Sequence, residues 1–203
     1  MPVAETLQTD TKIANTFDDA ELVKRFKSGS EEAFNTIVKR HQPKLLRVAA
    51  ILLKNETDAM DIVQDVFVKA YFKLRTFREE ASLFTWLYRI MYNSCITHLR
   101  RKKILSFMSL NDDENEIQLP SRDPEPDSEF ENKELMGAVT KALEKLPLRQ
   151  RMVFTLKQLN ELKYSEIAGI MEITEGAAKA SYFHAIRKLQ DLLKHYGDDY
   201  GLR

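Results

Sequence analysis

The chain has 203 residues, of which 43% are hydrophobic and 31% charged, and its 31 basic side chains balance 31 acidic ones. That length allows one ordinary domain or two small ones. The single cysteine, Cys95, excludes a disulfide framework within one chain and predicts a buried, inert thiol. No apolar run approaches the roughly 20 residues that span a bilayer, and residues 1–16 lack a signal-peptide core, so we expect a cytoplasmic protein without membrane insertion.

Helical periodicity dominates the chain, and no stretch alternates convincingly with a period of two, which predicts an all-α protein. Asp18 or Asp19 can cap a first helix that stops at Ser28-Gly29. Ser30 is an imperfect cap for a second helix with a clear apolar stripe, and Pro43 is expected to kink or break that helix.

Two further helices are predicted before residue 104. The third begins at a cap provided by Thr57 or Asp58 and runs to about Leu74. The fourth follows a short loop, with Ser82 as its cap, and runs to about Lys103.

An acidic stretch then interrupts the helical pattern. Residues 104–136 carry a net charge of −8, and three prolines lie among the acids, which is typical of a linker. Helices resume near Asn132, with a second from Leu148 to Leu159. Two more, over about 164–171 and 174–195, have the spacing of a helix-turn-helix.

We therefore predict two small helical domains with four segments in the chain. Residues 1–16 form a disordered tail, 17–103 a four-helix domain, 104–131 an acidic flexible linker, and 132–203 a helix-turn-helix domain.

Basic and aromatic residues are interleaved at the end of the first domain. Residues 69–103 carry a net charge of +7, and the six aromatics in and beside the loop and fourth helix are Phe72, Phe77, Phe84, Trp86, Tyr88 and Tyr92. Single-stranded nucleic acid needs this combination, because bases stack on rings while phosphates follow positive charge. The alternative is a basic amphipathic helix with an aromatic core. The four cations of 100–103 are expected to face phosphate.

The third helix sorts into two faces. The inward stripe is predicted to contain Met60, Val63, Phe67, Ala70 and Leu74, and the opposite side Asp61, Gln64, Asp65 and Val68. Taken alone, the second set is most often a solvated face.

The passage Asp58–Tyr71 resembles conserved region 2.2 of bacterial RNA polymerase sigma factors. Phe77-Arg78 and the passage Phe84–Ile90 look like regions 2.3 and 2.4 of the extracytoplasmic-function (ECF) class of the sigma-70 family. The resemblance implies that Asp61, Gln64 and Asp65 dock on the β′ clamp helices of core polymerase.

The same resemblance implies that the loop Arg75–Ser82 captures a flipped base of the non-template −10 strand. The residues that match by position are Phe77, Arg78, Ser82, Phe84, Trp86, Arg89 and Asn93, with Arg100 and Arg101 contacting phosphates. Trp86 and Tyr88 cannot both point the same way from one helix, so at least one is a core residue, and Trp86 is left between packing and DNA contact. Many relatives have glycine after the arginine that matches Arg78, and this chain has none.

The predicted helix-turn-helix has Thr174 as the cap of its second helix. Its inward stripe is Ala178, Tyr182, Ala185 and Leu189, and its outward residues are Glu175, Gly176, Ala177, Lys179, Ala180, Ser181, Phe183, His184 and Arg187. The segment resembles sigma region 4, which reads the −35 element in the major groove. The family often has arginine where this chain has Ser181.

The resemblance implies a promoter-specificity subunit that recognises −35 and −10 elements and helps to melt DNA. Its implied partners are core RNA polymerase through the β′ clamp helices and β flap, promoter DNA, and an anti-sigma factor. The linker would thread toward the RNA exit path, as in sigma factors. The four histidines lack metal-ligand spacing, and no cofactor is expected.

Two other functional classes compete with this interpretation. The first is a stand-alone helix-turn-helix regulator that binds duplex DNA without polymerase, although such a regulator has no use for the acidic face and aromatic loop of the first domain. The second is an enzyme. No phosphate-binding glycine loop or nucleophile arrangement supports it.

Overall fold

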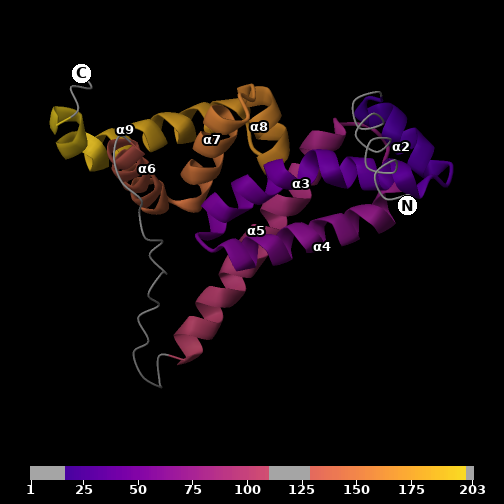
Figure 1. The fold of residues 1–203 in the computed structure, drawn as a ribbon, viewed down its shortest axis with the longest axis horizontal. Helices are drawn as coiled ribbons and strands as arrows, with labels where there is room; N and C mark the ends of the chain where they lie inside the picture. Colours follow the sequence, from indigo (N-terminus) through magenta and orange to yellow (C-terminus); the bar gives the residue numbers. More distant parts are fainter. Residues whose placement is uncertain (1–16, 110–128, 200–203) are drawn as a thin grey trace. The chain divides into compact units, whose positions relative to one another are not determined.

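The computed structural model describes residues 17–109 and 129–199, and the regular structure in these ranges is entirely α-helical (Figure 1). The all-α prediction is confirmed. Within the same ranges, no helix has both the length and the apolar character required to cross a membrane. The predicted tail, 1–16, and most of the predicted linker, 110–128, lie outside the described residues.

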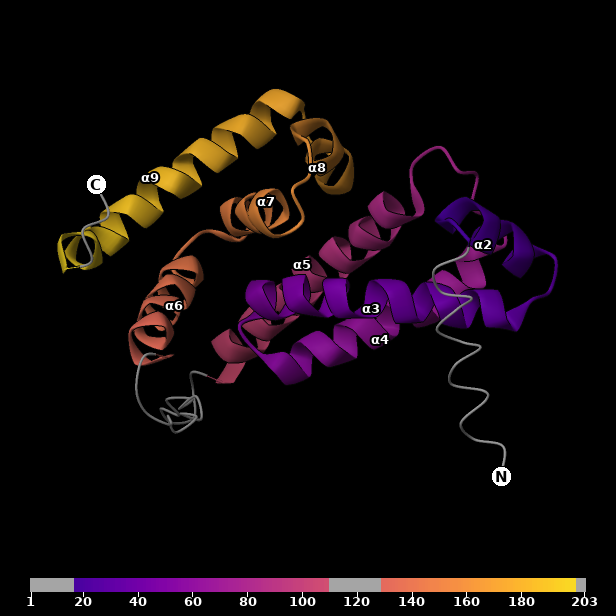
Figure 2. The same cartoon turned by 45° about the horizontal axis from the view of Figure 1, so that its top comes forward.

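Interresidue contacts divide the protein into two compact units. The helices of the first unit are α2 (Asp19–Lys27), α3 (Glu31–Leu53), α4 (Glu56–Leu74) and the part of α5 (Leu83–Ser109) up to Cys95. The C-terminal helices are α6 (Glu129–Glu144), α7 (Leu148–Leu159), α8 (Tyr164–Met171) and α9 (Glu175–Asp199), which Figure 2 shows in a second view.

Helix α2 begins and ends where its sequence predicts. The Asp18 carboxylate accepts a hydrogen bond from the Glu21 amide at 2.8 Å and so satisfies one of the free N–H groups of the first turn. The helix stops before Ser28 and Gly29, and Gly29 has a φ of 105°, which L-residues rarely adopt. The buried side chains Leu22, Val23 and Phe26 attach α2 to the rest of the unit.

Helix α3 begins after Ser30, whose hydroxyl accepts from the Ala33 amide at 3.3 Å. It is continuous through Pro43, so this proline does not break the helix. A proline removes one helical hydrogen bond. Here the burial of Leu45, Val48 and other apolar side chains beyond the proline keeps the second half of the helix in place.

Helix α4 corrects two predictions. Its cap is Asn55, two positions before Thr57, because the Asn55 side chain accepts from the Asp58 amide at 2.8 Å. Its buried stripe also excludes Met60, which is 53% exposed. The residues that are buried are Ala59, Ile62, Val63, Val66, Phe67, Ala70 and Leu74. This stripe is wider than the predicted one and is centred away from Met60.

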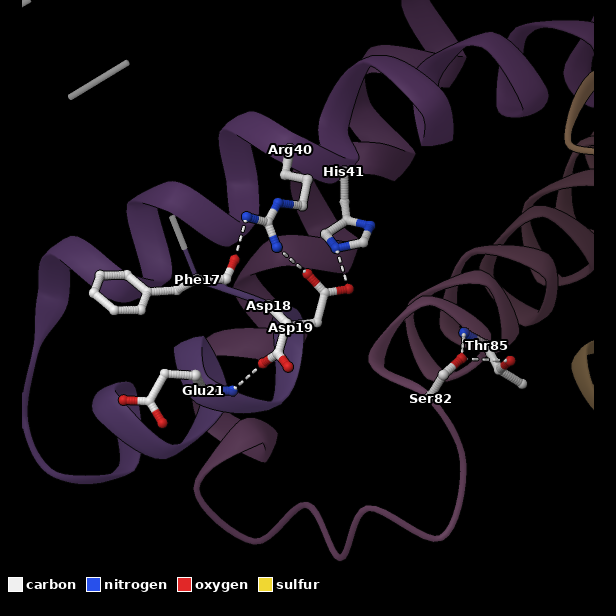
Figure 3. Close-up of polar contacts among 8 residues, drawn as sticks. All are labelled: Phe17, Asp18, Asp19, Glu21, Arg40, His41, Ser82 and Thr85. Atoms are coloured by element: carbon white, nitrogen blue, oxygen red, sulfur yellow. Dashed lines mark hydrogen bonds and ion pairs between the residues drawn. The ribbon is translucent and has the colours of Figure 1, made fainter. Parts of the chain in front are cut away.

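Helix α5 starts as predicted and continues beyond Lys103 to Ser109. The Ser82 hydroxyl accepts from the Thr85 amide at 3.1 Å and also bonds the Thr85 hydroxyl at 2.9 Å (Figure 3). Cys95 is fully buried, and this burial raises the pKa of its thiol to about 12. The thiol therefore stays protonated at neutral pH, which agrees with an inert core cysteine.

The C-terminal helices pack around a small apolar core. Ala142 and Leu146 meet Ala185 and Leu189 of α9 in that core. The first turn of α7 contributes the buried Arg151, whose guanidinium donates to the carbonyls of Glu144 at 3.0 Å and Leu146 at 2.9 Å. The Glu144 carbonyl is one that the end of α6 leaves free, and the Leu146 carbonyl lies in the turn that follows.

Helices α8 and α9 form the predicted helix-turn-helix. The Thr174 hydroxyl accepts from the Ala177 amide at 3.1 Å, so Thr174 caps α9 as predicted. Glu172, in the turn, has a φ of 55°, and the Ile173 amide bonds the Ala168 carbonyl at 3.1 Å. A left-handed residue followed by a hydrogen bond back to the preceding turn is a common way to end a helix.

Candidate nucleic-acid and polymerase interfaces

The aromatic side chains of the basic segment have two different roles. Tyr88 is fully buried, so it is the core member of the pair Trp86 and Tyr88. Trp86 is half-buried, and its ring centroid lies 5.0 Å from that of Phe77 in the preceding loop. Phe84 is also half-buried, with its ring 4.2 Å from Tyr88. The rings therefore form two packed pairs, each with a partly exposed member.

The polar residues predicted to bind the −10 strand are placed less uniformly. Arg78 and Asn93 are exposed, whereas Arg89 is half-buried. The hydroxyl of Ser82 is engaged in capping α5, although the residue itself is exposed.

The basic end of α5 is separate from these rings. Arg100 and Arg101 are exposed, and they lie about four helical turns beyond Phe84 along α5. They cannot contact the nucleotide that a loop pocket holds, so they are suited to a phosphate elsewhere on the strand.

The loop before α5 is attached to α2 by a residue that the sequence did not indicate. The Lys27 ammonium donates to the Phe77 carbonyl at 2.7 Å and to the Glu79 carboxylate at 3.1 Å. Glu79 has a φ of 59° and follows Arg78, at the position where the resemblance leads one to expect glycine. Nothing in the sequence connects a lysine at the end of α2 with a loop 50 residues further on.

The predicted polymerase-docking residues Asp61, Gln64 and Asp65 are all exposed on α4. Gln64 also lines an apolar groove of about 780 Å³ between α3 and α4. The other lining residues are Phe34, Val38, Gln42, Leu46, Met60, Val63, Phe67, Val68, Tyr71 and Phe72. Three of them are exposed apolar side chains: Met60, Val68 and Phe72, the last 73% exposed. The groove was not predicted, because Met60 was assigned to the core and Phe72 to the aromatic basic segment.

Most of the predicted outward residues of α9 are exposed, namely Glu175, Gly176, Lys179, Ala180, Phe183, His184 and Arg187, while Ala177 is half-buried. Ser181 is buried, which corrects its predicted outward placement. Its hydroxyl donates to the Ala177 carbonyl at 2.7 Å. Ser181 lies three residues after Ala178 and four before Ala185, both fully buried, and so shares their face of the helix.

Lys179 is an exposed cation near the start of α9. It forms an ion pair with Glu175 at 2.8 Å, and the hydrogen bond to this carboxylate raises the pKa of Lys179. His184 lies edge-on to the Phe183 ring, at 5.9 Å between centroids. In the described part of the chain, no group of three or more His, Cys, Asp or Glu side chains is arranged to hold a metal ion.

Comparison with known proteins identifies both halves of the chain. Residues 37–104 match the family model of sigma-70 region 2, and residues 136–189 match that of sigma-70 region 4. The ECF RNA polymerase sigma-E factor of Haemophilus influenzae is 31% identical over 189 residues, which cover 90% of this chain and 98% of the relative. The sigma-E factor of Escherichia coli K12 is 33% identical over 172 residues, 82% of this chain and 90% of that protein.

The chain belongs to the ECF class of RNA polymerase sigma factors. The predicted resemblance is thereby confirmed. This ECF sigma factor binds core RNA polymerase, recognises −35 and −10 promoter elements and helps to melt DNA for initiation. The competing interpretation, a stand-alone helix-turn-helix regulator, leaves the region 2 match unexplained.

Two solved sigma-factor structures resemble this one. The sigma factor RpoE of Bartonella quintana, solved with the anti-sigma factor NepR, has a TM-score of 0.63 and 25% identity over 79% of this chain and 96% of its own. CnrH, solved with the cytosolic domain of CnrY, has the same score and identity over 87% of this chain and 97% of its own. Helix α2, which includes Lys27, lies before the region 2 match.

Proposed function

We propose that three separate surfaces of this ECF sigma factor perform its work. The exposed face of α4 docks on core polymerase, the loop 75–82 with the start of α5 reads the melted −10 strand, and the start of α9 reads the −35 duplex. The observation that carries this division is the contrast between the two DNA-reading surfaces. One offers packed aromatic rings beside cations, and the other offers a capped helix with small residues in its first turn.

The docking surface combines charge with apolar area. Asp61, Gln64 and Asp65 supply hydrogen-bonding groups that the free protein leaves in water, and the groove beside them exposes Met60 and Val68. Exposed apolar groups next to polar ones are typical of protein interfaces, where the apolar centre supplies affinity and the polar rim supplies register. We assign the β′ clamp helices to this surface.

The −10 surface suits an unpaired base. The half-buried Phe77, Trp86 and Phe84 present rings that are already fixed by their neighbours, so a stacking base meets little conformational cost. Arg78 and Asn93 are both exposed, and we assign them contacts with the edges of the base or with the backbone. Arg100 and Arg101 supply phosphate contacts further along α5.

The −35 surface suits duplex DNA. Gly176, Ala177 and Ala180 are small, so the backbone amides at the start of α9 can approach a phosphate closely. Lys179, His184 and Arg187 are exposed and are proposed to contact phosphates or bases, and the exposed carboxylate of Glu175 is of the type that accepts from cytosine. Ser181 is buried and bonds the Ala177 carbonyl within the helix, so it is not among the proposed DNA contacts.

We further propose an anti-sigma factor among the partners. The RpoE structure contains the anti-sigma factor NepR, and the CnrH structure contains the cytosolic domain of CnrY. The β flap of core polymerase is proposed to hold the region 4 domain. RNA synthesis belongs to the core enzyme, so this subunit needs no catalytic centre of its own and works in the cytoplasm with the polymerase.

The docking surface is tested by charge reversal. Gln64→Arg with Asp65→Arg should weaken binding to core polymerase by on the order of tenfold or more, because both replace contacts at an interface. Binding is measured by titrating labelled full-length sigma factor with core enzyme. The control is Glu32→Arg, which reverses the charge of an exposed residue on α3, outside the proposed docking face. Equal affinities of the double variant and this control would refute the docking assignment.

A further inference from the structure

The loop between α4 and α5 has an unfavourable backbone at its centre. Glu79 has a φ of 59°, a left-handed conformation that costs free energy in residues other than glycine. Such a conformation persists only when surrounding contacts enforce it. The contact that the structure offers is the ion pair between Glu79 and Lys27 at 3.1 Å.

Lys27 also fixes the aromatic part of the same loop. Its ammonium donates to the Phe77 carbonyl at 2.7 Å and lies 5.9 Å from the centre of the Phe77 ring. The Phe77 ring in turn packs on Trp86 of α5. One ammonium group therefore holds the backbone of a residue whose ring contributes to the proposed stacking surface.

The end of α2 that carries Lys27 is held in place by the core of the first unit. The preceding turn of α2 contributes Val23 and Phe26 to the core, each 1% exposed. A lysine in the last turn of a helix is also favoured by the partial negative charge of that end. The lysine is thus a firm point of attachment for a loop that has no regular structure.

The pair has an electrostatic consequence for DNA. The loop contains two arginines and two glutamates, Arg75, Arg78, Glu79 and Glu80. A free carboxylate at Glu79 would repel a phosphate backbone, and the adjacent ammonium of Lys27 offsets that charge.

We propose that Lys27 is a positioning residue for −10 strand capture, acting through the Phe77 carbonyl and the Glu79 carboxylate. This inference rests on the proposed strand-reading role of the loop. Lys27 holds the loop in the conformation that places Phe77 on Trp86, so the incoming base binds a surface that is already formed.

The test uses holoenzyme reconstituted from core polymerase and full-length sigma variants. The probe is a short fluorescent single-stranded DNA copied from the non-template −10 strand of a promoter mapped by run-off transcription. Lys27→Met should weaken its binding roughly fivefold to tenfold, as expected for the loss of charge-assisted hydrogen bonds. Lys24→Met is the control, because it removes the same charge from an exposed position on α2. It should change binding by less than about twofold.

A second pair of variants separates positioning from simple stability. Glu79→Gly removes the strain of the left-handed backbone and the carboxylate together. In that background, Lys27→Met should weaken probe binding by only about twofold to threefold, because only its bond to the Phe77 carbonyl remains to be lost. Binding of a −35 duplex probe and binding to core polymerase should be unchanged throughout.

Two results would overturn the inference while leaving the strand-reading role intact. The first is an equal effect of Lys27→Met and Lys24→Met while Arg78→Ala still weakens probe binding. The second is a loss from Lys27→Met that extends to −35 duplex or core binding. If Arg78→Ala and Phe84→Ala also leave probe binding unchanged, the strand-reading role itself is wrong, and the inference fails with it.

Discussion

The proposed −10 reader and the proposed −35 reader are built in different ways. The −35 reader is one helix, α9, whose start is capped by Thr174 and whose exposed and buried residues follow helical periodicity. The −10 reader combines a loop, the start of α5 and a lysine from α2. A duplex presents a regular groove that a helix can enter as a rigid body, whereas a flipped base needs a pocket assembled from several segments. The −35 reader, which is a single helix, should therefore tolerate single substitutions better than the −10 reader, which is assembled from several segments.

The largest effect is expected in the assembled reader. Arg78→Ala with Phe84→Ala should reduce open-complex formation by about a hundredfold, because each lost stacking or charged contact is worth about 1–3 kcal/mol. Permanganate reactivity of promoter thymines measures opening. Phe84 also packs on the core residue Tyr88, so the thermal melting of the variant is the necessary control. Full thymine reactivity in a folded variant would contradict the proposed role of the loop.

A smaller effect is expected in the helical reader. Lys179→Ala should weaken holoenzyme binding to a −35 duplex by about tenfold and reduce the salt dependence of binding by about one phosphate contact. His184→Ala should act in the same direction. The measurement is a filter-binding titration over a range of salt concentrations. An unchanged salt slope would show that Lys179 remains with Glu175, its ion-pair partner at 2.8 Å, and does not contact DNA.

The first unit also contains a charge cluster that holds α2 against α3. Asp19 bonds Arg40 at 2.6 Å and the buried His41 at 3.0 Å (Figure 3). Burial raises the pKa of Asp19, but the hydrogen bonds and charges of His41 and Arg40 outweigh it and lower that pKa below its ordinary 3.8. A carboxylate with a lowered pKa stabilises the fold above the unfolded value, and this stability is lost as the pH falls through the folded pKa.

Asp19→Asn should therefore destabilise the protein by about 1–3 kcal/mol at neutral pH, the usual worth of hydrogen bonds between charged groups. The difference between wild type and variant should shrink as the pH falls below about 3.8. Urea unfolding of the full chain at several pH values checks both statements. If the difference in unfolding free energy persists unchanged at low pH, the charge of Asp19 does not stabilise the fold.

The smallest effect is expected at Ser181. Because its hydroxyl bonds the Ala177 carbonyl within the helix, Ser181→Ala should change the stability by no more than about 0.5 kcal/mol and −35 binding by less than about twofold. Competition binding with a −35 duplex is sensitive enough to check this. A tenfold loss would return Ser181 to the set of DNA contacts.

The sequence predicted most local features and missed those assembled from distant segments. The caps at Asp18, Ser30, Ser82 and Thr174 were predictable, because a cap depends on residues three positions apart. The cap of α4 at Asn55 was missed although it is equally local, because the neighbouring Thr57 and Asp58 are capping residue types as well. Met60 was placed wrongly because one apolar stripe can be drawn through α4 in more than one way, and the position of α3 decides between them. The outward placement of Ser181 was wrong, because its spacing from Ala178 and Ala185 puts it on their buried face of α9.

The contact from Lys27 to the loop could not have been predicted. A lysine at the end of a helix is most often a solvated residue, and its partners lie 50 and 52 residues away. The missing glycine after Arg78 was the one available signal. Glycine adopts a left-handed backbone at no steric cost, and the residue after Arg78 has that backbone in this structure. The missing glycine therefore marked a strained position, which is Glu79.

The separation of the two readers is the central claim, and transcription from a pre-melted template tests it most directly. Run-off yields are compared between a duplex promoter and the same promoter with a mismatched −10 region. Pre-melting should largely restore the yield of Lys179→Ala and His184→Ala holoenzymes and should not restore that of the Arg78→Ala, Phe84→Ala holoenzyme. Equal rescue of both classes of variant would contradict the account.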